Sequence, residues 1–233
     1  IAFQIRPWKQ LWKWHDARVI HTRHAHLSSY GHRSGRIMTW MSYVRQGFIE
    51  VNGARYDLSH MRGPTFELAI AATARYPALT LLIEVEFTSH CVSFGPKEGE
   101  ILDFDVLGQD RRILDHRRVA RAFCFDRYRW SLSLPALVRT LNGHFCNFTG
   151  QGNWLVIRAI DDQGREVDYE IYFRLRRQEK NALRMVVESA YVRAPDTPGA
   201  GVPHERKGRI RFQVMAAKVF RGEPLRDPGH HRR

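Results

Sequence analysis

From Tyr43 onward, apolar and polar positions follow the alternating period of β-strands over much of the chain. The first two such runs, 48–51 and 54–58, are separated by Asn52 and Gly53. An Asn-Gly pair supplies the positive φ values of a type I′ turn, which joins antiparallel strands with the correct twist. We therefore expect a β-hairpin at the start of the folded region.

Further runs of apolar and β-branched residues predict strands along the rest of the chain. They lie at 65–72, 79–88, 122–127, 153–160, 166–177, 182–193 and 209–220. In the run 166–177, Tyr169, Ile171 and Phe173 alternate with charged residues and Tyr172, so we expect one packed and one solvated face. In the run 209–220 the two expected faces carry Ile210, Phe212, Val214 and Ala216 on one side, and Arg209, Arg211 and Gln213 on the other.

One segment has the signals of a helix. Ser133 is placed as an N-cap, Pro135 suits the first turn, and Gly143 is placed to end the segment. Between them the apolar residues follow helical spacing: Leu134, Leu137, Val138 and Leu141. We expect this helix to pack its apolar side on the sheet.

These patterns predict an α+β fold with a dominantly antiparallel sheet, few helices, and a C-terminal β-meander with one packed helix. We expect a single α+β domain at 38–221, with a possible division into two sheets near 129–133. Residues 222–233 then form a loose tail.

Charge is concentrated at the N-terminus. The 233 residues contain 37 Lys and Arg against 24 Asp and Glu, a net charge of +13, and residues 1–37 account for +6 of it. This segment is also rich in Trp and His, so one interpretation is a basic arm that stacks on nucleic acid. The alternatives are a disordered extension and an internal translation start at Met38 or Met41.

Composition excludes several classes of protein. The longest strongly apolar run, 77–85, is much shorter than the roughly 20 residues that cross a bilayer, so no membrane association is expected. The 3 cysteines cannot all pair within the chain, which favours a reducing, cytoplasmic setting. No nucleotide-binding loop, hydrolase elbow or closely spaced zinc motif is present in the sequence.

A first group of candidate residues contains the parts of a nucleophile and its base. It combines the segment 57–60 with the segment 88–91, in which a histidine precedes a cysteine. Neighbours in an extended strand point to opposite faces, so a Cys91 nucleophile needs a base from elsewhere, such as His60 or His144. Catalytic candidates are His60, His90 and Cys91, and the alternative is buried structural side chains.

A second group is the full set of cysteines, Cys91, Cys124 and Cys146, together with His144. Three thiolates and an imidazole suit tetrahedral zinc, although only His144 and Cys146 have the close spacing of a structural site. The alternative, which we prefer, is no cofactor, with cysteine acting as a small buried apolar residue.

A third group lies on the expected solvated face of the C-terminal sheet. Arginine forks bind phosphate, so such a face suits nucleic acid or the transition state of RNA cleavage. A helix on an antiparallel sheet also resembles the architecture of small ribonuclease toxins, at the level of the fold only. The alternative is a solvated face with ion pairs to Glu188. The candidates are Tyr172, Arg174, Arg176, Arg184, Arg209 and Arg211.

A fourth group is the arginine-rich connection at 111–129. Basic residues interleaved with aromatic ones, as in Arg127 and Arg129 beside Tyr128 and Trp130, suit single-stranded nucleic acid. Acidic residues dilute this charge at positions 103, 105, 110, 115 and 126.

Five segments together resemble a group of uncharacterised bacterial proteins, some of which are called stationary-phase growth adaptation proteins. The segments are 56–60, 89–91, 121–128, 169–175 and 208–224, and the resemblance spans about residues 43 to 226. It implies a bacterial cytoplasmic setting and assigns no reaction or site residue.

The sequence is therefore interpreted as a bacterial α+β protein that contacts nucleic acid or another phosphate-bearing anion through a basic face. The alternatives are a metal-independent ribonuclease and a zinc-stabilised interaction domain.

Overall fold

The computed structural model describes residues 38–225, apart from 98, 149–152, 162 and 193–208. The expected basic extension at 1–37 and the end of the expected tail, 226–233, lie outside the described residues. The helices are α1 (Trp40–Gln46), α2 (Phe104–Leu107), α3 (Phe125–Ser131), α4 (Leu134–Arg139) and α5 (Phe212–Arg221). The strands are β1 (Phe48–Val51), β2 (Ala54–Asp57), β3 (Thr65–Ile70), β4 (Leu79–Phe87), β5 (Ser93–Phe94), β6 (Arg112–Leu114), β7 (Ala120–Phe123), β8 (Phe145–Phe148), β9 (Asn153–Ile160), β10 (Glu166–Arg177), β11 (Ala182–Val192) and β12 (Arg209–Arg211).

A seven-stranded sheet has the order β12-β8-β9-β10-β11-β4-β3. Its neighbours are antiparallel except β11 and β4, which pair in parallel. Strands from both halves of the chain thus join in one sheet, while β1-β2 and β5-β7-β6 form two small sheets. The α+β prediction with a mostly antiparallel sheet and few helices is confirmed.

The first hairpin forms as predicted. Asn52 and Gly53 have φ values of 53° and 72°, so both central residues of the turn take the left-handed conformation. The meander of β9, β10 and β11 also matches its predicted runs.

The helix expected between Ser133 and Gly143 forms in part. Helix α4 buries Leu134 and Val138 but ends at Arg139. Ser133 makes no side-chain cap, and a 3₁₀ turn, Leu141–Gly143, follows the helix.

The expected strand at 209–220 is wrong beyond its first residues. Only Arg209–Arg211 is extended, and the chain then turns into α5. In this helix Phe212, Met215 and Ala216 are buried whereas Val214 is 42% exposed, which is the spacing of a helical stripe. The apolar residues of this segment fit both the two-residue period of a strand and the 3.6-residue period of a helix. Burial against the sheet selects the helix.

The expected strand at 122–127 is also partly wrong. Strand β7 ends at Phe123 and α3 begins at Phe125. The rings of Phe125 and Tyr128, one helical turn apart, both pack around Tyr56 of the hairpin, at 5.5 and 5.3 Å between ring centroids. Helical spacing places both rings on one face toward that partner, which a continued strand would not.

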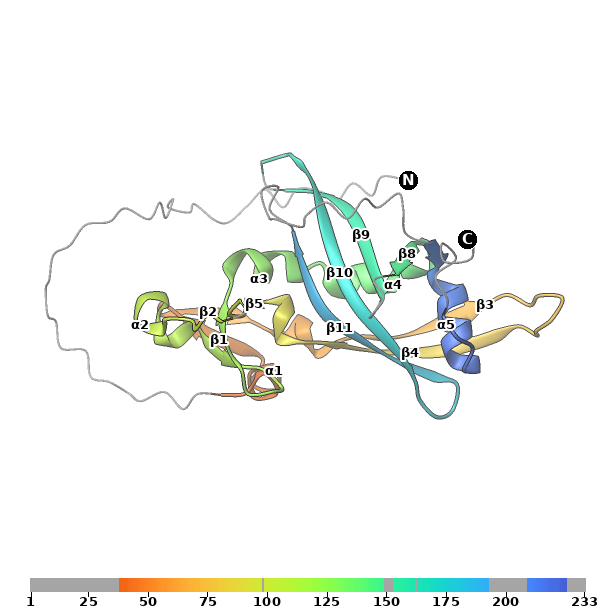
Figure 1. Cartoon of the computed structure of the whole chain (residues 1–233), viewed down its shortest axis with the longest axis horizontal. Coiled ribbons are helices and arrows are strands. Elements are labelled where there is room, and N and C mark those ends of the chain that lie inside the picture. Colours follow the sequence, from red (N-terminus) through yellow and green to blue (C-terminus); the bar gives the residue numbers. More distant parts are fainter. Residues whose placement is uncertain (1–37, 98, 149–152, 162, 193–208, 226–233) are drawn as a thin grey trace, which may run out of the picture.

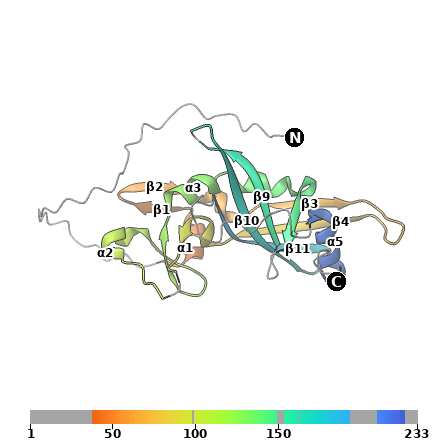
Figure 2. The same ribbon diagram turned by 45° about the horizontal axis from the view of Figure 1, so that its top comes forward.

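Helices cover the inner face of β10. Trp130 of α3 stacks on Tyr169, and Phe212 of α5 packs against Phe173 at 6.0 Å between ring centroids. Figure 1 shows the small sheets with α1 and α2 at one end of the molecule and α5 with the β3-β4 hairpin at the other. The same division is visible in Figure 2.

No helix in the described part of the chain combines the length and apolar character needed to span a bilayer.

Candidate functional site

The candidate site begins where β4 ends. Thr88 accepts a hydrogen bond from the backbone N–H of His90 and starts a single 3₁₀ turn, Ser89–Cys91. The Thr88 hydroxyl in turn donates to the carbonyl oxygen of Glu188 on β11, at 2.7 Å. The turn is therefore anchored to the large sheet from its first residue.

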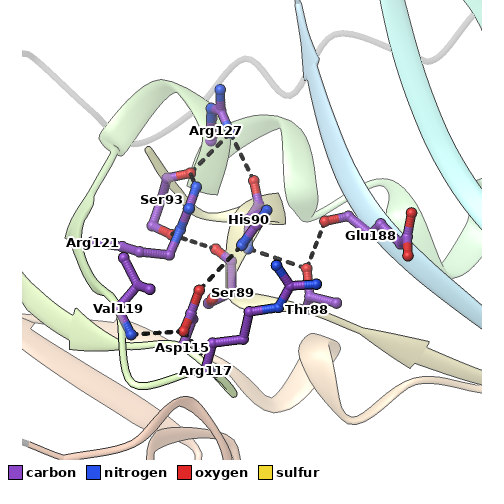
Figure 3. Close-up of polar contacts among 10 residues, drawn as sticks. All are labelled: Thr88, Ser89, His90, Ser93, Asp115, Arg117, Val119, Arg121, Arg127 and Glu188. Atoms are coloured by element: carbon purple, nitrogen blue, oxygen red, sulfur yellow. Dashed lines mark hydrogen bonds and ion pairs between the residues drawn. The ribbon is translucent and has the colours of Figure 1, made fainter. Parts of the chain in front are cut away.

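Two arginines from outside the large sheet pack against this turn (Figure 3). Arg121 of β7 donates from Nε to the Ser93 hydroxyl oxygen at 3.0 Å. Arg127 of α3 donates from Nη1 to the carbonyl oxygens of His90 and Ser93, at 2.9 and 2.8 Å. The Ser93 hydroxyl donates onward to the Ser89 carbonyl at 2.6 Å. The positive side chains thus hold the turn through carbonyl and hydroxyl oxygens.

Asp115 is a buried carboxylate at the same place, with its side chain 5% exposed. Its Oδ1 accepts the backbone N–H groups of Arg117 and Val119, at 2.8 and 2.9 Å. Its Oδ2 lies 3.6 Å from Nε2 of His90, whose side chain is 32% exposed. The backbone of the 115–119 turn therefore fixes the carboxylate that faces the imidazole.

Burial and positive charge dominate the electrostatics here. Burial, and then the charge of Arg121, lowers the pKa of His90 to about 4, although Asp115 acts in the opposite direction. Burial and the charge of Arg127 likewise lower the pKa of Arg121 to about 10. Burial acts to raise the pKa of Asp115, but hydrogen bonds from the N–H groups of Val119 and Arg117 hold it below its ordinary value.

A third arginine reaches the same place from the 115–119 turn. Arg117 is exposed, and in Figure 3 its side chain extends toward His90 and Thr88. We call Arg117, Arg121 and Arg127 the arginine cluster. Its charge exceeds that of the Asp115 carboxylate, so the site is suited to an anion.

Tyr172 is linked to the arginine cluster through the ring of Tyr191. Arg127 lies over the Tyr191 ring at 4.7 Å, and Tyr191 stacks on Tyr172 at 5.9 Å. The Tyr172 hydroxyl donates to the buried Glu170 carboxylate at 2.7 Å. Burial, together with the Glu170 contact, raises the pKa of Tyr172 far above its ordinary value.

The other two catalytic candidates form their hydrogen bonds outside the arginine cluster. The Cys91 thiol is fully buried and donates to the Val187 carbonyl at 3.7 Å, and burial raises its pKa to about 12. Nε2 of His60 lies 2.8 Å from the hydroxyl of buried Ser131, which donates to the Tyr128 carbonyl, so His60 is the donor to Ser131. Neither arrangement offers a nucleophile to solvent.

The four candidate zinc ligands are not gathered. Cys91 follows β4, Cys124 precedes α3, and His144 and Cys146 lie at β8. Across the described ranges, no three His, Cys, Asp or Glu side chains converge as a metal site.

The arginines expected on one sheet face are distributed differently. Arg174 pairs with Glu188 at 2.9 Å, and Arg184 forms an ion pair with Glu86. Strand β12 is separated from β11 by three strands, so its arginines lie apart from these. There Arg209 and Arg211 flank the Phe145 ring, at 5.4 and 5.1 Å. Arg176 is exposed on β10. Arg129, a candidate from the arginine-rich connection, pairs with Asp126 at 3.2 Å.

The structure therefore joins two groups that the sequence kept separate, namely the 88–91 segment and the arginine-rich connection. Asp115, Arg117 and Arg121 belong to that connection, and no local pattern in the sequence links them to His90. A shallow groove of about 320 Å³, lined by residues such as Met41, Met61 and Glu86, lies apart from His90. Half of its lining residues are apolar and its arginines and glutamates balance in charge, so it does not favour an anion.

Residues 48–220 match the model of the YjaZ family. The matched range contains every residue of the site just described, and the match supports the resemblance to uncharacterised bacterial proteins. No curated protein and no solved structure matches the chain.

Proposed function

We propose that this chain, which belongs to the YjaZ family, binds the phosphate backbone of a nucleic acid at the arginine cluster. The observation that carries the proposal is the convergence of Arg117, Arg121 and Arg127 on one turn, where Asp115 is the acid that offsets them. A bacterial cytoplasmic setting and a role in stationary-phase growth stay predictions from the sequence.

Hydrogen-bonding capacity supports a phosphate ligand. Arg127 uses Nη1 for both carbonyls, and among the described residues its Nε and Nη2 form no hydrogen bond. A guanidinium with two free N–H directions matches two oxygens of one phosphate. Arg117 is exposed and lies on the other side of His90 in Figure 3, so the two arginines would contact different phosphates of one strand.

The arginine cluster fits this role better than the solvated face of the sheet. Arg174 and Arg184 on that face are neutralised by Glu188 and Glu86, and exposed pairs of this kind already satisfy their charge. In the cluster, burial lowers the pKa of Arg121 to about 10, so a bound anion would relieve the crowding of positive charge.

The test is binding of a labelled single-stranded RNA by fluorescence anisotropy at increasing salt. Affinity should fall steeply as salt rises, because bound counterions are released from the phosphates. Arg117→Gln, at an exposed position, should weaken binding and reduce the salt slope by about 0.7, the effect of one lost phosphate contact.

Arg174→Gln is the matched control, because Arg174 is exposed but paired with Glu188. It should leave affinity and slope unchanged. Binding that does not depend on salt, or equal losses in the two variants, would remove the arginine cluster as the binding site.

A further inference from the structure

We infer that this site also cleaves RNA, with His90 as the general base and Asp115 as the residue that positions it. The inference rests on the proposed function, since it requires RNA phosphates to lie at the arginine cluster.

The geometry orients the imidazole. Asp115 is held through Oδ1 by two backbone N–H groups, which leaves Oδ2 facing Nε2 of His90 at 3.6 Å. Nε2 is enclosed and has no partner at hydrogen-bond distance. With its N–H directed at the carboxylate, the ring carries its lone pair on Nδ1.

Nδ1 is available to a substrate. Among the described residues it accepts no hydrogen bond, and only Nε2 of this ring is both buried and unpaired. A structural histidine with its ring in the protein interior normally has its nitrogens satisfied. A His-Asp contact slightly longer than a hydrogen bond is instead common in catalytic sites without substrate.

Burial, together with the arginines, keeps the ring neutral and hence able to accept a proton. Burial and the charges of Arg121 and Arg127 lower the pKa of His90 to about 4. A bound phosphate adds negative charge beside these arginines, which raises the basicity of the imidazole when substrate is present. The imidazole of His90 is thus a base whose basicity increases when the substrate binds.

The reaction is transfer of the phosphoryl group within the RNA strand. Nδ1 of His90 takes the proton of a ribose 2′-hydroxyl, the O2′–P bond forms, and the P–O5′ bond breaks. The leaving O5′ takes a proton from water. The hydroxide formed in this way then accepts the proton that His90 took from the 2′-hydroxyl. The products are a 2′,3′-cyclic phosphate and a 5′-hydroxyl, while the arginine cluster stabilises the charge that develops on the phosphate oxygens.

The experiment incubates end-labelled RNA with the full chain in the presence of a chelator and follows the products on a denaturing gel. We expect cleavage that ends in a cyclic phosphate, and none in the same oligonucleotide made with 2′-deoxyribose. His90→Gln should lower the rate at least about 100-fold and still bind the deoxy oligonucleotide.

Two further variants distinguish the role of His90 from that of other histidines and test the positioning role of Asp115. His60→Gln is the matched control, because His60 contacts Ser131 rather than the cluster, and it should cleave at the wild-type rate. Asp115→Asn should lower kcat by a larger factor than it changes KM, because it misdirects the ring, whereas its lost negative charge favours binding of the anionic substrate. An equal change in both constants contradicts a positioning role.

The outcomes distinguish the two proposals. Salt-dependent binding of the deoxy oligonucleotide with RNA left intact overturns cleavage and leaves the binding function standing. Failure to bind any oligonucleotide overturns the binding function itself. Cleavage that persists in a folded His90→Gln protein, or that proceeds in the deoxy oligonucleotide, overturns the role of His90.

Discussion

Individual side chains in this protein acquire their chemistry from neighbours that are distant in sequence. Burial, and then the charges of Arg121 and Arg127, lowers the pKa of His90 to about 4 from an ordinary value of 6.5. Between these two pH values the unfolded chain binds a proton at this position that the folded chain does not. The free energy of unfolding must therefore fall as pH drops from 6.5 toward 4.

His90→Gln should remove part of this dependence. Urea unfolding at pH 7, 6 and 5 is expected to show a smaller loss of stability in this variant than in the wild-type chain. His60, whose pKa is also lowered by burial, leaves a residual slope in the same direction. His116→Gln, at an exposed neighbouring position, should keep the wild-type profile. Identical slopes for all three proteins would contradict the assignment.

At the scale of elements, the connection that leads into β3 passes so close to β4 that one of its positions requires glycine. Gly63 precedes β3 and has a φ of 70°, and a Cβ atom at this position would overlap the carbonyl oxygen of Val85. Gly53 in the first hairpin has a similar φ of 72° with nothing within 4 Å of the same Cβ position. Substitutions at the two positions therefore distinguish the cost of backbone strain alone from the cost of strain with steric overlap.

Gly63→Ala should destabilise the fold by about 3 kcal/mol, because strain and overlap add. Gly53→Ala should cost only about 1 kcal/mol, the usual penalty of the left-handed conformation. Denaturant unfolding of both variants provides the measurement. Equal losses would mean that the connection at Gly63 relaxes away from β4.

At the scale of the whole molecule, α5 packs the C-terminal part of the fold against the large sheet. Phe212 is fully buried against Phe173, while Val214 on the same helix is 42% exposed. Packing of this kind, rather than helical propensity, provides most of the stability of a ten-residue helix.

Phe212→Ala should therefore lower the free energy of unfolding by about 3–5 kcal/mol, the usual cost of deleting a buried phenyl ring. Val214→Ala is the control and should change it by less than about 1 kcal/mol. Thermal and urea unfolding would detect the difference. Similar values for the two variants would show that α5 contributes little to the core.

Much of the fold could be predicted from local patterns. The Asn52-Gly53 turn, the alternation around Tyr169 and the Pro135 helix start each depend on residues close in sequence. The strand predictions at 122–127 and 209–220 are wrong beyond Phe123 and Arg211, because apolar spacing there satisfies two periods. In both, burial of rings against distant partners selected the helix.

The candidate site was less predictable for a physical reason. The sequence alone determined its residue types: a histidine after β4, a connection rich in arginine, and a net charge of +13 that favours anions. Only the tertiary structure decided which of them meet. Arg121 reaches Ser93 over 28 positions, and Arg127 reaches the His90 carbonyl over 37. Contacts over such separations depend on how sheets and helices pack, which no local period encodes.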